Sequence, residues 1–166
     1  MPSTIRVFTI IFSLFCFLGS AFKSIGQNHP LKLSEESQIS VITFGPYQGK
    51  LWSAFGHNGI RVYDPQLDID WMYDWGRFDF EQANFFWNFA RGKMLYSIGR
   101  TQKYPSVKSY YIKQNRSIKE QVLNLSWAQN QAFFNYLEHN NLPENRTYLY
   151  NYVYDNCATK IRDIIQ

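Results

Sequence analysis

The sequence predicts a single α+β domain with a small antiparallel sheet, preceded by an export signal. Strand-like and helix-like segments follow one another without the regular strand–helix–strand rhythm of a parallel sheet. The chain contains no internal repeat, no low-complexity tract and no shift in composition that would mark a second domain. About 140 residues remain after the signal, which is enough to bury one hydrophobic core.

Residues 1–26 show the three parts of a secretory signal peptide. Arg6 precedes the uncharged apolar stretch Val7 to Phe22, and Ser24-Ile25-Gly26 has the small-x-small pattern of a cleavage site, with an earlier cut after Ala21 as the alternative. The 16 residues of the apolar stretch are short for a membrane span, because about 20 are usually needed. We therefore expect a cleaved signal and a periplasmic protein.

The charge of the mature chain excludes one class of partner. Removing residues 1–26 takes away Arg6 and Lys23, so 17 basic residues become 15 against 13 acidic ones, a net charge of +2. This balance gives no reason to expect a nucleic acid. Aromatic residues make up 19% of the chain, and we expect most of them in the core and some on a surface that contacts apolar ligands.

The first half of the mature chain predicts a lead-in and three strands. Residues 27–37 are a polar lead-in, and the domain proper covers 38–166. Alternating β-branched and aromatic residues predict strands at Ile39–Phe44, His57–Tyr63 and Trp71–Trp75, the last two forming a hairpin, with a short helix or turn at Gly49–Phe55.

The second half alternates helices and strands. Helical spacing of aromatics predicts a helix at Phe80–Ala90, and the later segments are a strand at Met94–Ile98, a helix at Tyr104–Gln114, a strand at Ser117–Leu125 and a strand or loop at Tyr148–Tyr154. Ser126 and Gln129 form a capping-box signature for a helix to Asn140. A last helix begins near Cys157 and stops after one or two turns, an ending typical of a shortened member of a longer family.

Cys157 is the strongest candidate for chemistry. The only other cysteine, Cys16, lies in the signal, so the mature chain cannot form an intrachain disulfide. Asp155 and Asn156 are good helix N-caps, and a thiol in the first turn of a helix is stabilised as thiolate by the helix dipole and the nearby amides. The residue pattern is typical of a nucleophile, and the alternative is a buried packing residue.

A cysteine nucleophile needs a base, and His57 is the best candidate. His29 lies in the lead-in and His139 on the polar end of a predicted helix, so we expect both on the surface. His57 begins a strand, and Asp74 on the next strand can face it across an antiparallel pair and hold the imidazole tautomer. The alternative for Asp74 is a solvated carboxylate near a turn.

Other chemistries lack a sequence signal. One cysteine and three scattered histidines do not have the spacing of a metal site, and neither a phosphate-binding glycine loop nor a Gly-x-Ser-x-Gly elbow occurs. We expect no metal and no cofactor.

Five segments together resemble a known family. They are AFGHNGIRVYDP (54–65), YDWGRFDF (73–80), NFFWNFARGK (84–93), EQVLNL (120–125) and LPENRTYLYNYVYDNCATKIRDII (142–165). In this order they resemble the Lnb N-terminal periplasmic domain family of Bacteroidota and related bacteria. The order of His57 and Cys157 also resembles the permuted branch of the papain-like NlpC superfamily, which includes the lecithin:retinol acyltransferases.

The resemblance implies a lipoprotein N-acyltransferase type of domain with a permuted papain-like fold. Cys157 would accept an acyl chain as a thioester, His57 would be the general base and acid, and Asp74 would stand where relatives often carry Asn. The implied partners are a phospholipid, the N-terminus of a lipoprotein and the membrane surface. The alternatives are a cysteine hydrolase of the peptidoglycan amidase or peptidase type and a non-catalytic envelope module.

Three further residues are candidates for substrate binding. Arg61 and Arg91 lie in the family-like segments and have the charge to meet a phosphate headgroup. Asn156 flanks the nucleophile and is a candidate donor to an oxyanion, although the backbone amide of Cys157 is the safer one.

Overall fold

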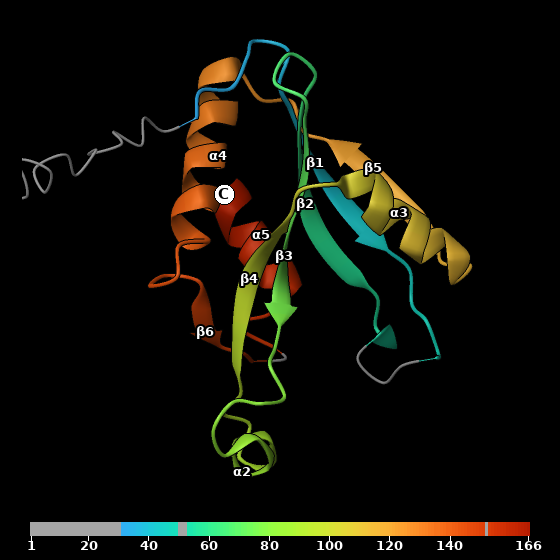
Figure 1. Cartoon of the computed structure of the whole chain (residues 1–166), viewed down its shortest axis with the longest axis vertical. Helices are drawn as coiled ribbons and strands as arrows, with labels where there is room; N and C mark the ends of the chain where they lie inside the picture. The colour runs from blue at the N-terminus through green and yellow to red at the C-terminus, as the bar shows by residue number, and fades with distance from the viewer. Residues whose placement is uncertain (1–30, 50–52, 152) are drawn as a thin grey trace, which may run out of the picture. The chain divides into compact units, whose positions relative to one another are not determined.

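A six-stranded sheet organises the chain. The computed structural model describes residues 31–49, 53–151 and 153–166, and Lys32–Gln166 form one compact unit (Figure 1). The sheet order is β5-β1-β2-β3-β4-β6, with every neighbouring pair antiparallel. The strands are β1 Gln38–Phe44, β2 His57–Asp64, β3 Ile69–Arg77, β4 Leu95–Thr101, β5 Ile118–Val122 and β6 Thr147–Leu149. The described helices are α2 Phe85–Ala90, α3 Tyr104–Lys113, α4 Trp127–Asn140 and α5 Cys157–Ile165.

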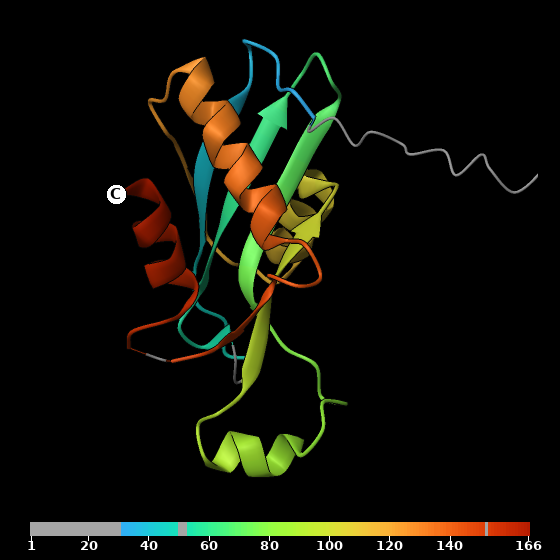
Figure 2. The ribbon, with the colours of Figure 1, turned by 90° about the vertical axis from the view of Figure 1, so that its left-hand side faces the viewer.

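Helices cover both faces of the sheet. Figures 1 and 2 show α4 and α5 on one face and α3 on the other. Alternation along β2 and β3 turns Ile60, Val62 and Tyr73 toward α4 and α5, where they join Phe134, Leu137 and Ile161 in the larger core. A smaller cluster of Ile42, Phe44, Met72 and Tyr104 lies on the opposite face.

The α+β class and the antiparallel sheet are confirmed. Each predicted strand is present with ends shifted by a few residues, and the last helices begin at their expected caps. Residues 27–30 of the predicted lead-in, His29 and the predicted signal at 1–26 lie outside the described residues, as do residues 50–52 of the predicted turn. Leu33, from the rest of that lead-in, is buried in the larger core.

The predicted helix at Phe80–Ala90 is too long. The helix α2 contains only six residues, Phe85–Ala90. The Asp79 side chain accepts a hydrogen bond from the Glu81 N–H at 2.9 Å, which forms a local turn, and Asn84 has a positive φ of 57°. Both features interrupt the helical backbone before Phe85, although the aromatic spacing is helical throughout.

Candidate active site

The N-terminus of α5 positions Cys157. Asn156 is the N-cap, and its side-chain oxygen accepts hydrogen bonds from the N–H groups of Ala158 at 2.9 Å and Thr159 at 3.1 Å. The Thr159 hydroxyl in turn accepts from the Asn156 N–H at 2.8 Å. This capping box places the half-buried thiol in the first helical turn, where the helix dipole favours a negative charge.

The start of β2 positions His57. Gly56, directly before it, has a φ of +83°, and a Cβ at Gly56 would lie 2.7 Å from the Phe44 carbonyl oxygen, so the backbone approaches β1 closely here. The His57 ring stacks with Phe44 at 6.3 Å between centroids, and Phe44 stacks on Tyr111 at 3.8 Å. These rings shield one side of the imidazole from water.

Asp74 orients the imidazole. The antiparallel register pairs Gly59 of β2 with Asp74 of β3, and His57 Nε2 lies 3.1 Å from Asp74 Oδ2. Both side chains are largely shielded, with exposed fractions of 21% and 19%. Because Nε2 faces the carboxylate, Nδ1 is the ring nitrogen left for the thiol of Cys157, with which His57 also interacts as a hydrogen-bonding partner.

The sheet opens where α5 meets it. The pairing of β2 with β3 ends at Gly59 and Asp74, so Asn58 lies beyond the last pair. The backbone N–H groups of Asn58 and Ala158 both help to lower the pKa of the Cys157 thiol. The thiolate is therefore favoured by backbone amides of a strand and of its own helix.

Arg77 completes the carboxylate's environment. Residues 74 and 77 would face opposite sides of a regular strand, but β3 bulges between Trp75 and Arg77, with Gly76 at a φ of +98°. Arg77 therefore shares a side with Asp74 and donates to its Oδ1 through Nε at 2.7 Å and through Nη2. Gly99, the β4 partner of Asp74, provides the space, because a Cβ there would lie 2.5 Å from the guanidinium.

Sequence reasoning missed Arg77. The available signal was Gly76 inside an otherwise regular strand pattern, which is typical of a bulge. Recognising the bulge would have moved Arg77 to the face of Asp74.

The electrostatics favour a thiolate and an imidazolium. Burial by itself lowers the pKa of His57, but hydrogen bonds to Asp74 and Cys157 and their negative charges outweigh it and raise the pKa to about 9. Burial by itself raises the pKa of Cys157, but the hydrogen bond and charge of His57 lower it overall. Despite burial, His57 and Arg77 also hold the pKa of Asp74 below its usual value. Both shifts favour the thiolate–imidazolium form of the pair beside the Asp74 carboxylate.

The structure does not bring the two predicted substrate-binding arginines to Cys157. Arg61 lies four residues along β2 from His57, about 13 Å away for an extended strand. Its guanidinium forms ion pairs with Asp70 at 2.6 Å and Glu120 at 2.9 Å. Arg91 follows α2 and stacks over Trp87 at 5.6 Å.

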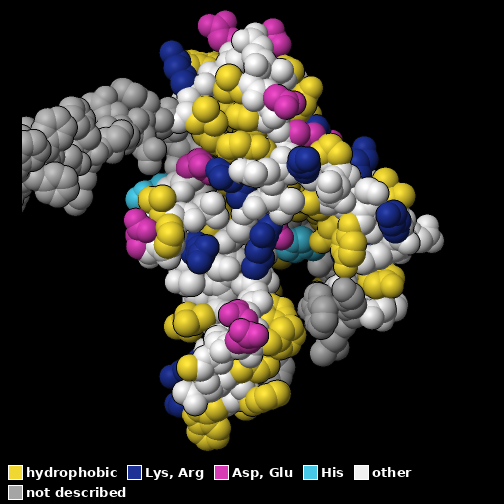
Figure 3. All heavy atoms as spheres, viewed as in Figure 1, with side chains coloured by type: hydrophobic (Ala, Val, Ile, Leu, Met, Phe, Trp, Pro, Cys, Tyr) yellow, Lys and Arg dark blue, Asp and Glu magenta, His cyan; other side chains and the backbone are white. Residues whose placement is uncertain are grey.

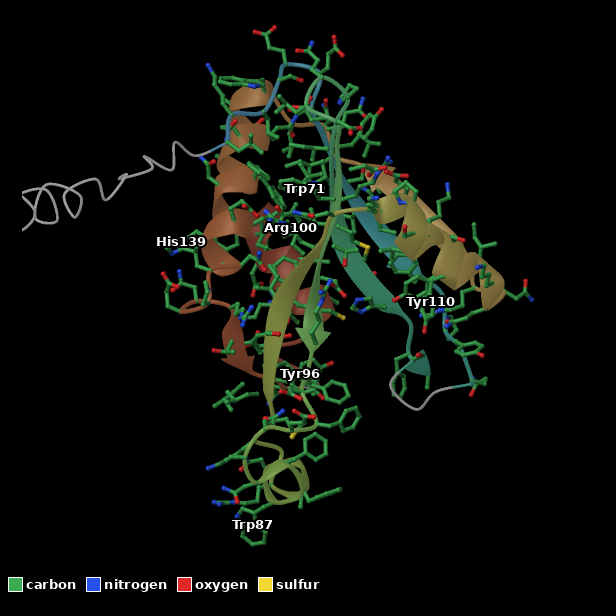
Figure 4. All side chains as sticks on the ribbon, in the orientation of Figure 1. Trp71, Trp87, Tyr96, Arg100, Tyr110 and His139 are labelled. Atoms are coloured by element: carbon green, nitrogen blue, oxygen red, sulfur yellow. The ribbon has the colours of Figure 1, made fainter. Side chains whose placement is uncertain are left out.

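Asn156 and His139 have local roles in the structure. The Asn156 side-chain oxygen accepts the capping hydrogen bonds of α5, and the amide nitrogen is the group of this side chain that can donate to a substrate. His139 is exposed on α4, where it contacts Asn145, and Figure 4 shows it on the outer side of that helix.

Comparison with known proteins identifies the family. The family model described as "Lnb N-terminal periplasmic domain" matches residues 28–166. This chain belongs to that family. No curated protein and no solved structure gave a significant match.

Membership of the Lnb N-terminal periplasmic domain family makes this chain a periplasmic domain. Within the part of the chain that the structure describes, no helix is long and apolar enough to cross a membrane. The same residues contain no group of three or more His, Cys, Asp and Glu side chains arranged to hold a metal ion.

Proposed function

We propose that this domain is a periplasmic cysteine acyltransferase that acts in lipoprotein N-acylation through a thioester on Cys157. The observation that carries the proposal is the contact of one imidazole with two partners. His57 meets the Asp74 carboxylate at 3.1 Å through Nε2 and interacts with the thiol of Cys157 at a helix N-terminus. A nucleophile, a base and an orienting group in this order are the requirements of covalent acyl transfer.

In the first step, the Cys157 thiolate attacks the ester carbonyl of a phospholipid. A carbon–sulfur bond forms, the ester carbon–oxygen bond breaks, and the His57 imidazolium gives its proton to the departing lysophospholipid oxygen. The backbone N–H of Cys157 has no intrahelical acceptor at this position of a helix and is suited to stabilise the oxyanion.

In the second step, the α-amino group of a lipoprotein's N-terminal cysteine attacks the thioester. The amide bond forms as the carbon–sulfur bond breaks, and the neutral imidazole of His57 takes the proton lost by the amine. The thiolate and the imidazolium are thereby restored. Asp74 keeps Nε2 occupied, so that Nδ1 exchanges the proton in both steps.

We further propose that the fold is a permuted papain-like domain. In such an arrangement the histidine strand precedes the cysteine helix, as β2 precedes α5 here. The contact between these elements, far apart in sequence, supports the proposal.

Intact-protein mass spectrometry tests the acyl-enzyme directly. The protein purified after export is incubated with a phospholipid in detergent, and we expect an acyl adduct on Cys157 that hydroxylamine removes. Cys157→Ala and His57→Ala should lose the adduct, whereas His139→Ala, which changes an exposed histidine of α4, should keep it. Adding a peptide with a diacylated N-terminal cysteine should then discharge the adduct onto the peptide amine.

Two results would overturn this function. If the adduct is lost to water at the same rate with and without the peptide, the result would favour a cysteine hydrolase. A folded protein that gives no adduct, and whose Cys157 is alkylated no faster than a free thiol, would favour a non-catalytic module.

A further inference from the structure

The most exposed apolar side chains are concentrated at one end of the sheet. Among the large apolar residues of the described chain, seven are at least 58% exposed. They are Phe55 (95%), Phe86 (83%), Tyr154 (79%), Val153 (67%), Trp87 (64%), Phe80 (61%) and Leu149 (58%). We call this set the apolar rim.

The topology places the apolar rim at the same end as Cys157. In this antiparallel sheet, β1 ends at Phe44, β2 begins at His57, β3 ends at Arg77 and β4 begins at Leu95. These four strand termini therefore lie at the same end of the sheet. The rim lies in the β1–β2 connection, in the β3–β4 connection with α2, and in the stretch from the end of β6 to α5. All three segments flank the residues of the proposed acyl-enzyme chemistry.

A chain of aromatic ring contacts supports the α2 part of the rim. Tyr150 stacks with Tyr96 at 4.3 Å, and ring contacts of 4.8–5.4 Å continue from Tyr96 through Phe78, Phe80 and Phe85 to Phe86. Trp87 lies at the tip of this extension and points away from the sheet in Figure 4. These ring contacts hold the segment in place, so that Trp87 stays exposed at its tip.

Basic side chains accompany the rim. Residues 82–96, which include α2, contain Arg91 and Lys93 and no acidic residue, although Asp79 and Glu81 directly precede them. Figure 3 shows hydrophobic side chains gathered around α2 with basic ones beside them. The β1–β2 connection, residues 45–56, contains Lys50 and no acidic residue. Asp155, the one acidic residue in the sequence of the third segment, is paired with Lys160 at 2.8 Å.

We infer that the apolar rim docks this end of the domain onto an anionic phospholipid bilayer, with α2 inserted at the level of the headgroups. Aromatic residues with adjacent Arg and Lys are the composition of interfacial membrane contacts, where rings enter the acyl boundary and cations meet lipid phosphates. The inference rests on the proposed function for its purpose, since docking would deliver the ester of a phospholipid to Cys157. A second copy of the chain is less suited, because a stable dimer buries one contiguous, well-packed patch, whereas the rim is divided among three separate connections.

Vesicle flotation tests the inference. The protein purified after export, and therefore without its apolar signal, is mixed with vesicles of phosphatidylethanolamine and phosphatidylglycerol. We expect it to float with the vesicles, and Phe86→Ser/Trp87→Ser to reduce the bound fraction at least about tenfold. Ile112→Ser/Val122→Ser is the matched control, because Ile112 (57%) and Val122 (55%) are exposed apolar residues on α3 and β5, outside the rim.

The charge component has its own test. Arg91→Gln/Lys93→Gln should weaken binding to these vesicles and remove most of its salt dependence, with little effect on binding to vesicles of phosphatidylcholine alone. Equal flotation of the rim variant and the control variant would overturn the inference. A rim variant that changes the oligomeric state in gel filtration, with vesicle binding unchanged, would assign the rim to a second copy instead.

The acyl donor's physical state separates this inference from the proposed function. If both hold, Phe86→Ser/Trp87→Ser should form the Cys157 adduct normally with a monomeric short-chain phospholipid and slowly with vesicles. If neither the wild-type protein nor the rim variant forms an adduct with either donor, but the rim variant still loses flotation, docking stands and acyl transfer fails. If the rim variant forms the adduct on vesicles at the wild-type rate, docking fails and acyl transfer stands.

Discussion

His57 is the neighbour that most favours the thiolate of Cys157. His57 provides both a hydrogen bond and a positive charge that lower the pKa of the thiol against the effect of burial. We expect His57→Ala to raise that pKa and to slow alkylation of Cys157 by iodoacetamide at pH 7 at least about tenfold, because the thiolate fraction falls about tenfold per pKa unit. His139→Ala should alkylate at the wild-type rate, and an equal rate in both variants would remove His57 from the site.

Asp74 sets the protonation state of that ring. Its carboxylate favours the charged imidazolium, and together with Cys157 it raises the pKa of His57 to about 9. Asp74→Asn keeps an acceptor but removes the charge, so the pKa of His57 should fall toward its ordinary value of about 6.5. Titration of the His57 ring signals by NMR checks the direction, and a midpoint that stays near 9 would contradict it.

Arg77 is a positioning residue in this geometry, because it touches Asp74 and not the thiol. Its guanidinium holds Asp74 Oδ1 and also donates to the Thr101 hydroxyl at 2.9 Å. We expect Arg77→Ala to lower kcat of acyl transfer about tenfold or more with little change in KM, since the carboxylate loses its fixed orientation. Arg77→Lys should retain only part of kcat, because an ammonium cannot reproduce the two hydrogen bonds that the guanidinium donates to Asp74 through Nε and Nη2.

The control for Arg77 is another arginine. Arg162 is exposed on α5 and pairs with Asp163. Arg162→Ala should leave kcat and KM unchanged, and full rescue by Arg77→Lys would argue that charge alone matters at position 77.

At the scale of elements, the cap of α5 connects stability with reactivity. Asn156→Ala removes the acceptor for two helix N–H groups and should lower the free energy of unfolding by about 1 kcal/mol, measured by urea denaturation. Asn156→Asp should keep most of that free energy, because a carboxylate also caps a helix. Its negative charge beside Cys157 should nevertheless raise the thiol pKa and shift the alkylation profile to higher pH. A profile identical to the wild type would contradict this account.

At the scale of the whole molecule, stability comes from the larger core and not from the exposed aromatics. Phe134 on α4 is 1% exposed and packs between that helix and the sheet, whereas Phe86 is 83% exposed. Phe134→Ala should cost about 3–5 kcal/mol of unfolding free energy, and Phe86→Ala less than about 0.5 kcal/mol. Thermal denaturation of the two variants compares the same substitution at buried and exposed positions, and equal costs would refute this partition.

Local patterns in the sequence determined most of the elements. The capping box at Ser126 and Gln129 and the N-cap at Asn156 are confirmed, because a cap is formed by residues within one turn of each other. The strands were predicted from alternating side chains, which are also a pattern of neighbouring residues. The prediction at Phe80–Ala90 was wrong in its first half, since aromatic spacing does not record the turn at Asp79 or the positive φ of Asn84.

Contacts between distant segments were decided by the tertiary structure. The sequence by itself indicated the class of fold and proposed Cys157, His57 and Asp74, but their meeting requires the register of β2 on β3 and the packing of α5 against that pair. Arg77 reaches Asp74 only through a bulge in β3. The exposed aromatics gather only because three connections lie at the same end of the sheet. The register of strands, the bulges and the meeting of connections at one end of the sheet arise from pairing between segments far apart in the chain. A local sequence pattern does not encode such pairing.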